Sequence, residues 1–259
     1  MNAASYGMTA LGIFGLVASI GLSQPAGAQD DPAARFLAAI HAAAVPQPNL
    51  IDDQLVPVVP TNPKLEWVGT GDEARVKVVS WMSENAFQRY WSTPAELPAD
   101  GQASAGWGRV SWVTAVPQVR DFCRALGKDV DATTNRLKQL LGLSPDWQYH
   151  RFVEFLVSPK DLFRPCPDPE IDDSRCELTN ANPAPDDYRL WFVNNYANSY
   201  AVSGAPWTRL GYTYDWAPAA DRANPRKPYG ASEFIVRPGA NYTVTARYTT
   251  AQYCGIGEK

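Results

Sequence analysis

The sequence predicts an α+β fold, with a mainly antiparallel sheet, a few packed helices and disulfide staples. Segments that alternate polar and apolar residues, as strands do, follow segments with helical periodicity in irregular order. The regular strand–helix alternation of a parallel sheet is missing, and this favours the α+β class. An even number of cysteines, four in 259 residues, supplies the cross-links.

The first 28 residues have the features of a secretory signal peptide. They contain no Asp, Glu, Lys or Arg, and residues 8–22 form an apolar run. Ala26-Gly27-Ala28 then provides the small residues that precede a cleavage site. The alternative is an uncleaved anchor helix, but the run is shorter than the roughly 20 residues that span a bilayer. We therefore expect an exported protein, periplasmic or secreted, whose mature chain begins at Gln29 and has no membrane span.

The mature chain divides into a short N-terminal region, residues 29–63, and a single α+β domain, residues 64–259. Residues 31–44 are rich in alanine, and Asp30-Asp31-Pro32 stands at their start, which predicts a helix. Residues 45–63 contain five prolines, which prevent regular structure and favour an extended linker.

Alternation and capping patterns place the elements of the domain. Strands are expected at 74–82, 109–114, 148–157, 232–236 and 241–248, and a loop at 98–108. The last two strands are predicted to form a hairpin through Pro238-Gly239-Ala240. Helices are expected at 117–126, with Pro117 in the first turn, and at 131–141, with Asp131 as its cap and Gly142 after its end.

Charge and motif content exclude several function classes. The 23 basic and 27 acidic residues give a net charge of −4, without the basic excess of a nucleic-acid-binding protein. There are two histidines, His41 and His150, and no H-E-x-x-H, G-x-S-x-G or glycine-rich phosphate loop. We expect no cofactor.

The cysteines, Cys123, Cys166, Cys176 and Cys254, are widely spaced and contain no C-x-x-C pair. A zinc site is therefore poorly supported, and two disulfides are the better interpretation for an exported chain. Three pairings are possible. We favour Cys166–Cys176, because the nine residues between them resemble a loop, and this leaves Cys123–Cys254.

The loop between Cys166 and Glu177 is acidic. It carries Asp168, Glu170, Asp172, Asp173 and Glu177, whose oxygens are of the kind that calcium prefers. The glycine turn and the terminal bidentate acid of a calcium loop are missing. A solvated loop closed by a disulfide is the favoured interpretation, and no metal is expected.

Aromatic residues gather between positions 188 and 216. The first group fits one face of a helix and is expected in the core: Tyr188, Trp191, Phe192, Tyr196 and Tyr200. The second group, Trp207, Tyr212, Tyr214 and Trp216, surrounds Arg209 and Asp215 in a segment broken by glycine and proline. These six residues are the candidate binding loop for a small molecule or a glycan. The alternative is that Arg209 and Asp215 form an ion pair that fastens a structural loop.

Three function classes stay open. The first is an exported binding or envelope-associated protein with an aromatic-lined ligand loop. The second is a carboxylate-based glycan hydrolase, for which Glu154, Asp215 and Glu233 are the candidate acids, because their apolar neighbours would raise a pKa. The third is a structural protein of the cell envelope that docks on a partner through its N-terminal helix and linker.

Overall fold

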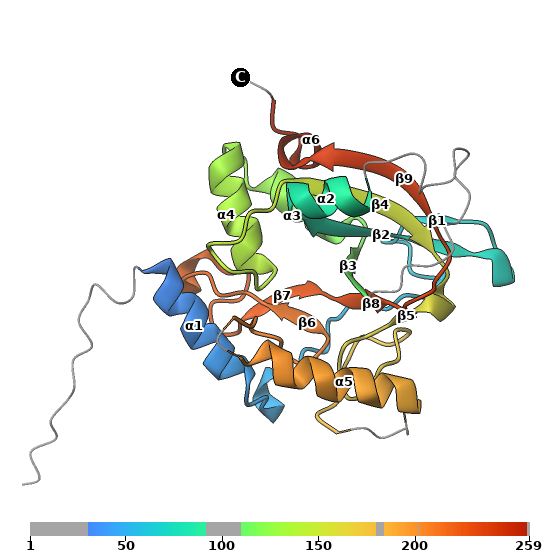
Figure 1. The fold of residues 1–259 in the computed structure, drawn as a ribbon, viewed down its shortest axis with the longest axis horizontal. Coiled ribbons are helices and arrows are strands. Elements are labelled where there is room, and N and C mark those ends of the chain that lie inside the picture. The colour runs from blue at the N-terminus through green and yellow to red at the C-terminus, as the bar shows by residue number, and fades with distance from the viewer. Residues whose placement is uncertain (1–30, 92–109, 180–183, 202, 258–259) are drawn as a thin grey trace, which may run out of the picture.

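The chain folds as an α+β structure, as the sequence predicts. Figure 1 shows the computed structural model, which describes residues 31–91, 110–179, 184–201 and 203–257. The expected signal peptide at 1–28 and the expected loop at 98–108 lie outside these residues. No helix in the described ranges has the length and apolarity required to cross a bilayer.

Six α-helices and nine strands make up the described part of the chain. The helices are α1 (Pro32–Ala43), α2 (Glu84–Tyr90), α3 (Gln118–Ala125), α4 (Val130–Leu140), α5 (Asp186–Ser199) and α6 (Thr250–Cys254). The strands are β1 (Trp67–Val68), β2 (Arg75–Met82), β3 (Ser111–Ala115), β4 (Arg151–Val157), β5 (Leu162–Phe163), β6 (Tyr212–Tyr214), β7 (Tyr229–Ser232), β8 (Phe234–Val236) and β9 (Tyr242–Thr249).

Seven of these strands form one antiparallel sheet, in the order β5-β8-β3-β2-β4-β9, with β1 added beside β2. In its centre Val78 lies opposite Phe155, which lies opposite Val244. Strands β6 and β7 form a separate two-stranded sheet. In Figure 1 this small sheet lies between the large sheet and the helices α1 and α5.

The predicted hairpin at Pro238-Gly239-Ala240 is wrong, although both of its strands exist. Strand β8 pairs with β3 and β5, whereas β9 pairs with β4 near the opposite edge of the sheet. Residues 237–241 therefore cross between distant strands. The ring of Tyr242 packs against Phe155, with ring centroids 5.3 Å apart, and this long-range burial directs the chain to β4. Alternation identifies a strand but not its partner.

The large sheet carries apolar side chains on both faces. One face contributes Val78, Phe155 and Tyr242 to a buried cluster that also contains Trp91. The other contributes Val79 and its neighbours to a second cluster, beneath helices α3, α4 and α6. That cluster contains Val79, Trp81, Val116, Val119, Cys123, Leu137, Phe152, Ala231, Tyr253 and Cys254. Helices on one face and apolar contacts on the other explain why β2 and β4 are buried along most of their length.

Helix α4 matches the predicted helix, apart from its cap. Asp129, and not Asp131, is the N-cap, and its side chain accepts a hydrogen bond of 2.8 Å from the Ala132 N–H. Asp131 lies in the first turn, where a negative charge still stabilises the helix dipole. Gly142 follows the helix with φ +64°, the left-handed conformation that glycine adopts readily. Pro117 likewise precedes α3 as its N-cap and does not lie within it.

The N-terminal region packs against the body. Ala39, Ile40 and Ala43 of α1 are buried. Residues 45–63 contain no α-helix or strand, as their prolines predict. This segment is nevertheless fastened, because the Val56 N–H donates to Ser232 Oγ over 2.9 Å. The apolar face of α1 is thus used within the chain.

Two disulfides join the cysteines, in the pairing favoured from the sequence. Cys123–Cys254 links α3 to α6, and Cys166–Cys176 closes the acidic loop. Their sequence separations are 131 and 10 residues. In the chain-entropy account a longer closed loop restricts the unfolded chain more strongly.

Replacing both cysteines of the long bridge by alanine should therefore lower the free energy of unfolding more than replacing those of the short bridge. The expected losses are about 5 kcal/mol for Cys123–Cys254 and about 3 kcal/mol for Cys166–Cys176. Chemical denaturation of the two double variants measures both values. Equal losses, or a larger loss for the short bridge, would contradict this account.

Candidate functional site

A cavity of about 530 Å³ lies where the large sheet, the small sheet and the end of α5 meet. Its wall is mainly apolar. The aromatic lining residues are Trp81, Tyr90, Trp91, Trp112, Trp147, Tyr149, Phe152, Trp207 and Tyr214. The volume falls within the range of small-molecule sites in proteins, which are mostly lined by hydrophobic and aromatic side chains. Trp112 and Trp147, each 37% exposed, leave part of this wall accessible to solvent.

Glu233 supplies the one carboxyl group among the described lining residues. The residue is 6% exposed, and its Oε1 has no hydrogen-bond partner. Burial raises the pKa of Glu233 to about 8, so the carboxyl group is largely protonated at neutral pH. An unpaired buried carboxyl is costly to keep ionised, which is why the proton is retained.

Strand geometry puts Glu233 at the cavity. The preceding residue, Ser232, pairs with Tyr212 in the small sheet, and the following residue, Phe234, pairs with Val113 in the large sheet. Glu233 is the single residue at which the chain passes from one sheet to the other. Its N–H donates to the Gly211 carbonyl over 3.0 Å, which fixes the backbone at this crossover.

Two of the six residues of the candidate binding loop line the cavity. Trp207 is 5% exposed, and its indole N–H donates to the Pro165 carbonyl over 3.0 Å. Its ring contacts Trp112 and Phe192, so its orientation is held from several sides. Tyr214 also lines the cavity and is partly buried. Burial raises the pKa of its phenol.

The aromatic rings of Tyr212 and Trp216 lie in the core and do not line the cavity. The Tyr212 hydroxyl donates to the Leu50 carbonyl over 2.7 Å. The Trp216 indole N–H donates to the Leu143 carbonyl over 3.0 Å, and its ring meets Phe36 of α1 edge-on. Tyr212 therefore fastens the N-terminal region to the body. Trp216 connects helix α1 with the residues that follow α4.

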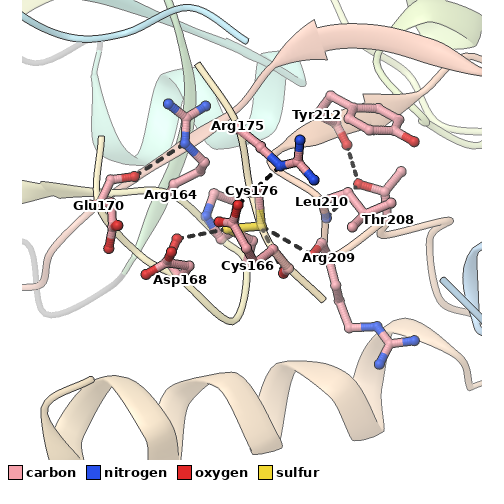
Figure 2. Close-up of a disulfide and its surroundings, with 12 residues drawn as sticks. Arg164, Cys166, Asp168, Glu170, Arg175, Cys176, Thr208, Arg209, Leu210 and Tyr212 are labelled. Carbon is pink, nitrogen blue, oxygen red and sulfur yellow. Dashed lines mark hydrogen bonds and ion pairs between the residues drawn. A yellow bond between two sulfur atoms is a disulfide. The ribbon is translucent and has the colours of Figure 1, made fainter. Parts of the chain in front are cut away.

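Arg209 and Asp215 do not pair with each other. Asp215 is fully buried and accepts hydrogen bonds of 3.1 and 2.6 Å from the two terminal nitrogens of Arg136. The Arg209 guanidinium extends toward α5 (Figure 2) and donates to the Tyr200 hydroxyl over 3.0 Å and to the Ala44 carbonyl over 2.7 Å. Neither side chain lines the cavity, so the expected convergence of these two charges on one ligand space is not observed.

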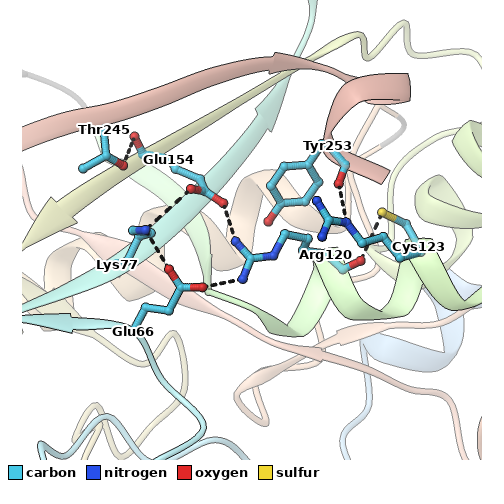
Figure 3. Close-up of polar contacts among 8 residues, drawn as sticks. Glu66, Lys77, Arg120, Cys123, Glu154, Thr245 and Tyr253 are labelled. Carbon is cyan, nitrogen blue, oxygen red and sulfur yellow. Dashed lines mark hydrogen bonds and ion pairs between the residues drawn. The ribbon is translucent and has the colours of Figure 1, made fainter. Parts of the chain in front are cut away.

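Glu154 belongs to a separate group of charges on the helix-covered face of the sheet (Figure 3). It accepts a hydrogen bond of 3.3 Å from Arg120 and lies 3.9 Å from Lys77 Nζ, and both cations also contact Glu66. Burial raises the pKa of Glu154, while the two cations act in the opposite direction. Among the described residues, Glu154, Asp215 and Glu233 thus occupy three different environments, and one alone lines the cavity.

The acidic loop encloses a cation that belongs to the protein. Arg164 is fully buried, and it donates to the Glu170 carbonyl over 3.2 Å (Figure 2). It also donates to the carbonyls of Asp173 over 2.8 Å and Val56 over 3.3 Å. Burial lowers the pKa of Arg164 to about 10, against the opposing effect of the surrounding acids. Burial and Glu170 together raise the pKa of Asp168 to about 6. Within the described ranges, no three His, Cys, Asp or Glu side chains gather as a metal site.

No sequence pattern singles out Trp112 or Trp147 as cavity residues, because they come from segments far from the aromatic stretch 188–216. No local pattern identifies Arg164 either, because arginine side chains are mostly exposed and the flanking residues do not predict full burial.

The two histidines lie apart from this cavity. His41 is exposed on α1, and His150 is exposed beside β4, in an open depression that also contains Glu84 and Asp131.

We expect Glu233→Gln to remove a pH dependence of stability. The folded state keeps a proton that the unfolded chain, with its ordinary pKa of 4.5, releases. The free energy of unfolding of the parent should therefore fall as the pH rises from about 4.5 to about 8 and then level off. Urea denaturation across this range should show Glu233→Gln more stable than the parent near pH 8, by a few kcal/mol at most, and equal near pH 4.

The exposed acid Glu73 provides the control, since Glu73→Gln should keep the profile of the parent. Parallel profiles for the parent and Glu233→Gln would show that the carboxyl group is ionised or solvated in the folded state.

No protein-family model, curated protein or solved structure matches the chain.

Proposed function

We propose that the chain is an exported binding protein that holds a small, predominantly apolar molecule in the aromatic cavity. The observation that carries the proposal is the combination of a cavity of about 530 Å³ with one buried, unpartnered carboxyl group, Glu233, in its wall. Ligand sites commonly combine a mainly apolar lining with a few polar groups that orient the ligand. A buried acceptor without a partner is a group that a ligand can satisfy.

The charges of the described cavity favour binding over glycan hydrolysis. Glycosidases use two carboxyl groups on either side of the scissile bond. Of the three candidate acids, Asp215 is held by Arg136 and Glu154 by Arg120, which leaves Glu233 alone in the lining. A single acid can orient a ligand but cannot provide both roles.

The N-terminal helix gives little support to the alternative of a structural protein that docks on a partner through this helix. Its buried residues, Ala39, Ile40 and Ala43, face the body of the same chain. Phe36 contacts Trp147 and Trp216. The helix therefore supports one side of the cavity, since Trp147 lines it.

Export is part of the proposal and rests on two observations. The apolar run and small-residue box of residues 1–28 have the order of a signal peptide. Both disulfides are of the kind that persist in oxidising compartments. A periplasmic or secreted location accommodates both.

Blocking the cavity should weaken binding of an apolar probe. An uncharged dye, N-phenylnaphthylamine, should bind the parent saturably, with a rise in its fluorescence. Ala205 lines the cavity and is partly buried, so the indole of Ala205→Trp would occupy the ligand space. We expect at least about a tenfold loss of affinity, which corresponds to 1.4 kcal/mol.

Ala197→Trp is the matched control. Ala197 is exposed on α5 and does not line the cavity, so the same substitution there should leave dye affinity unchanged. Melting temperatures of both variants establish that they are folded. Equal affinities of both variants, or a parent that does not bind the dye, would overturn the proposed site.

Export makes a separate prediction. Intact-mass measurement of the protein recovered outside the cytoplasm should give a chain that begins at Gln29, within about two residues. A full-length mass in the membrane fraction would contradict cleavage.

A further inference from the structure

Among the described lining residues, the cavity combines aromatic walls with one acid and no positively charged side chain. Tryptophan and tyrosine rings carry negative potential on their faces, and they attract cations that lie within about 6 Å of the ring centre. No Lys, Arg or His occurs among the described lining residues. The cavity therefore presents Glu233 and electron-rich rings to whatever enters it.

Three arginines of the described chain direct their hydrogen bonds to groups other than Glu233. Arg136 pairs with Asp215, and Arg164 donates to backbone carbonyls of the acidic loop. Arg209 contacts Tyr200 and the Ala44 carbonyl. Among the described residues, no cation pairs with Glu233, whose Oε1 has no hydrogen-bond partner.

Building on the proposed function, we propose that the ligand is an organic cation, an amine or a quaternary ammonium compound, whose charged group lies beside the Glu233 carboxylate. Its apolar part would contact the aromatic wall. The positive charge of such a ligand would act as the counter-ion of the buried acid and would also interact with the faces of the aromatic rings.

Binding then includes a proton step. In the empty cavity the Glu233 carboxyl group holds a proton, because its pKa is raised to about 8. When the cation enters, the O–H bond breaks, the carboxylate pairs with the ligand and the proton leaves for the solvent. Affinity for a permanent cation must therefore rise with pH until Glu233 is ionised without the ligand.

The other ionisable groups around Glu233 are tyrosines and one arginine, Arg164, which lies behind Phe234. Tyr200 and Tyr212 interact electrostatically with Glu233, and burial raises the pKa of both, that of Tyr200 to about 12. Tyr90 on α2, Tyr149 before β4 and Tyr214 on β6 line the same cavity. Arg164 reaches this region from behind Phe234, whose ring it covers at 5.2 Å. No carboxylate or histidine of the described lining competes with Glu233 for the pH response.

Two probes of the same shape distinguish the contribution of charge to affinity from that of apolar contact. Phenyltrimethylammonium is a permanent cation, and tert-butylbenzene is its uncharged counterpart. Displacement of N-phenylnaphthylamine from the full-length mature chain gives the affinity of each. Between about pH 6 and about pH 9 the affinity for the cation should rise by up to about 100-fold, with the slope declining near pH 8. The affinity for tert-butylbenzene should change less than about twofold over the same range, since no proton is exchanged.

Glu233→Gln tests the residue itself, and its melting temperature reports folding. The variant should bind the cation more weakly than the parent near pH 9, and this binding should no longer depend on pH. Binding of tert-butylbenzene together with a flat cation profile in the parent would overturn the cation inference and leave the proposed cavity intact. If neither probe nor the dye binds, the proposed function itself is wrong.

Discussion

The centre of the molecule depends on the interactions of one buried group, the guanidinium of Arg164. It donates hydrogen bonds to the Val56 carbonyl, before β1, and to the Asp173 carbonyl of the acidic loop, and it covers the ring of Phe234. Gly211 lies against its side chain so closely that an added Cβ would approach Arg164 Cδ to 2.6 Å. The Gly211 carbonyl accepts the Glu233 N–H, so the arginine packs against the backbone that holds the cavity acid. Without it, three segments would lose their common attachment.

A second constraint follows from the same centre. Buried charges in proteins are generally paired, and this chain pairs Asp215 with Arg136 and Glu154 with Arg120. Glu233 departs from that pattern, because its Oε1 has no hydrogen-bond partner and the carboxyl group lies in the cavity wall. A group that is costly to bury and is left without a partner commonly marks a site where something else is bound. Asp215 and Glu154 are paired with arginines and have structural roles, whereas the unpaired Glu233 marks the cavity as the candidate binding site.

Local patterns in the sequence predict most of the elements, and long-range contacts explain what they miss. Strands β2 and β4, and helix α4 with Gly142 after its end, follow from periodicity and capping. The partner of β9 depends on where the ring of Tyr242 is buried, which no local pattern contains. The same holds for the site. The acidity of Glu233 and the aromatic character of Trp207 are evident in the sequence, but their shared cavity with Trp112 depends on three distant segments.

The fastening of the N-terminal segment to the last third of the chain has a kinetic consequence. Val56 bonds to Ser232, 176 residues away, and the Ile51 carbonyl accepts from Tyr229, 178 residues away. The loops that join such positions are long, and their closure precedes any gain from the contacts. During synthesis, residues 51–56 emerge well before their partners exist. Their packing must therefore be among the late events of folding, completed after the strand bearing Ser232 has been released.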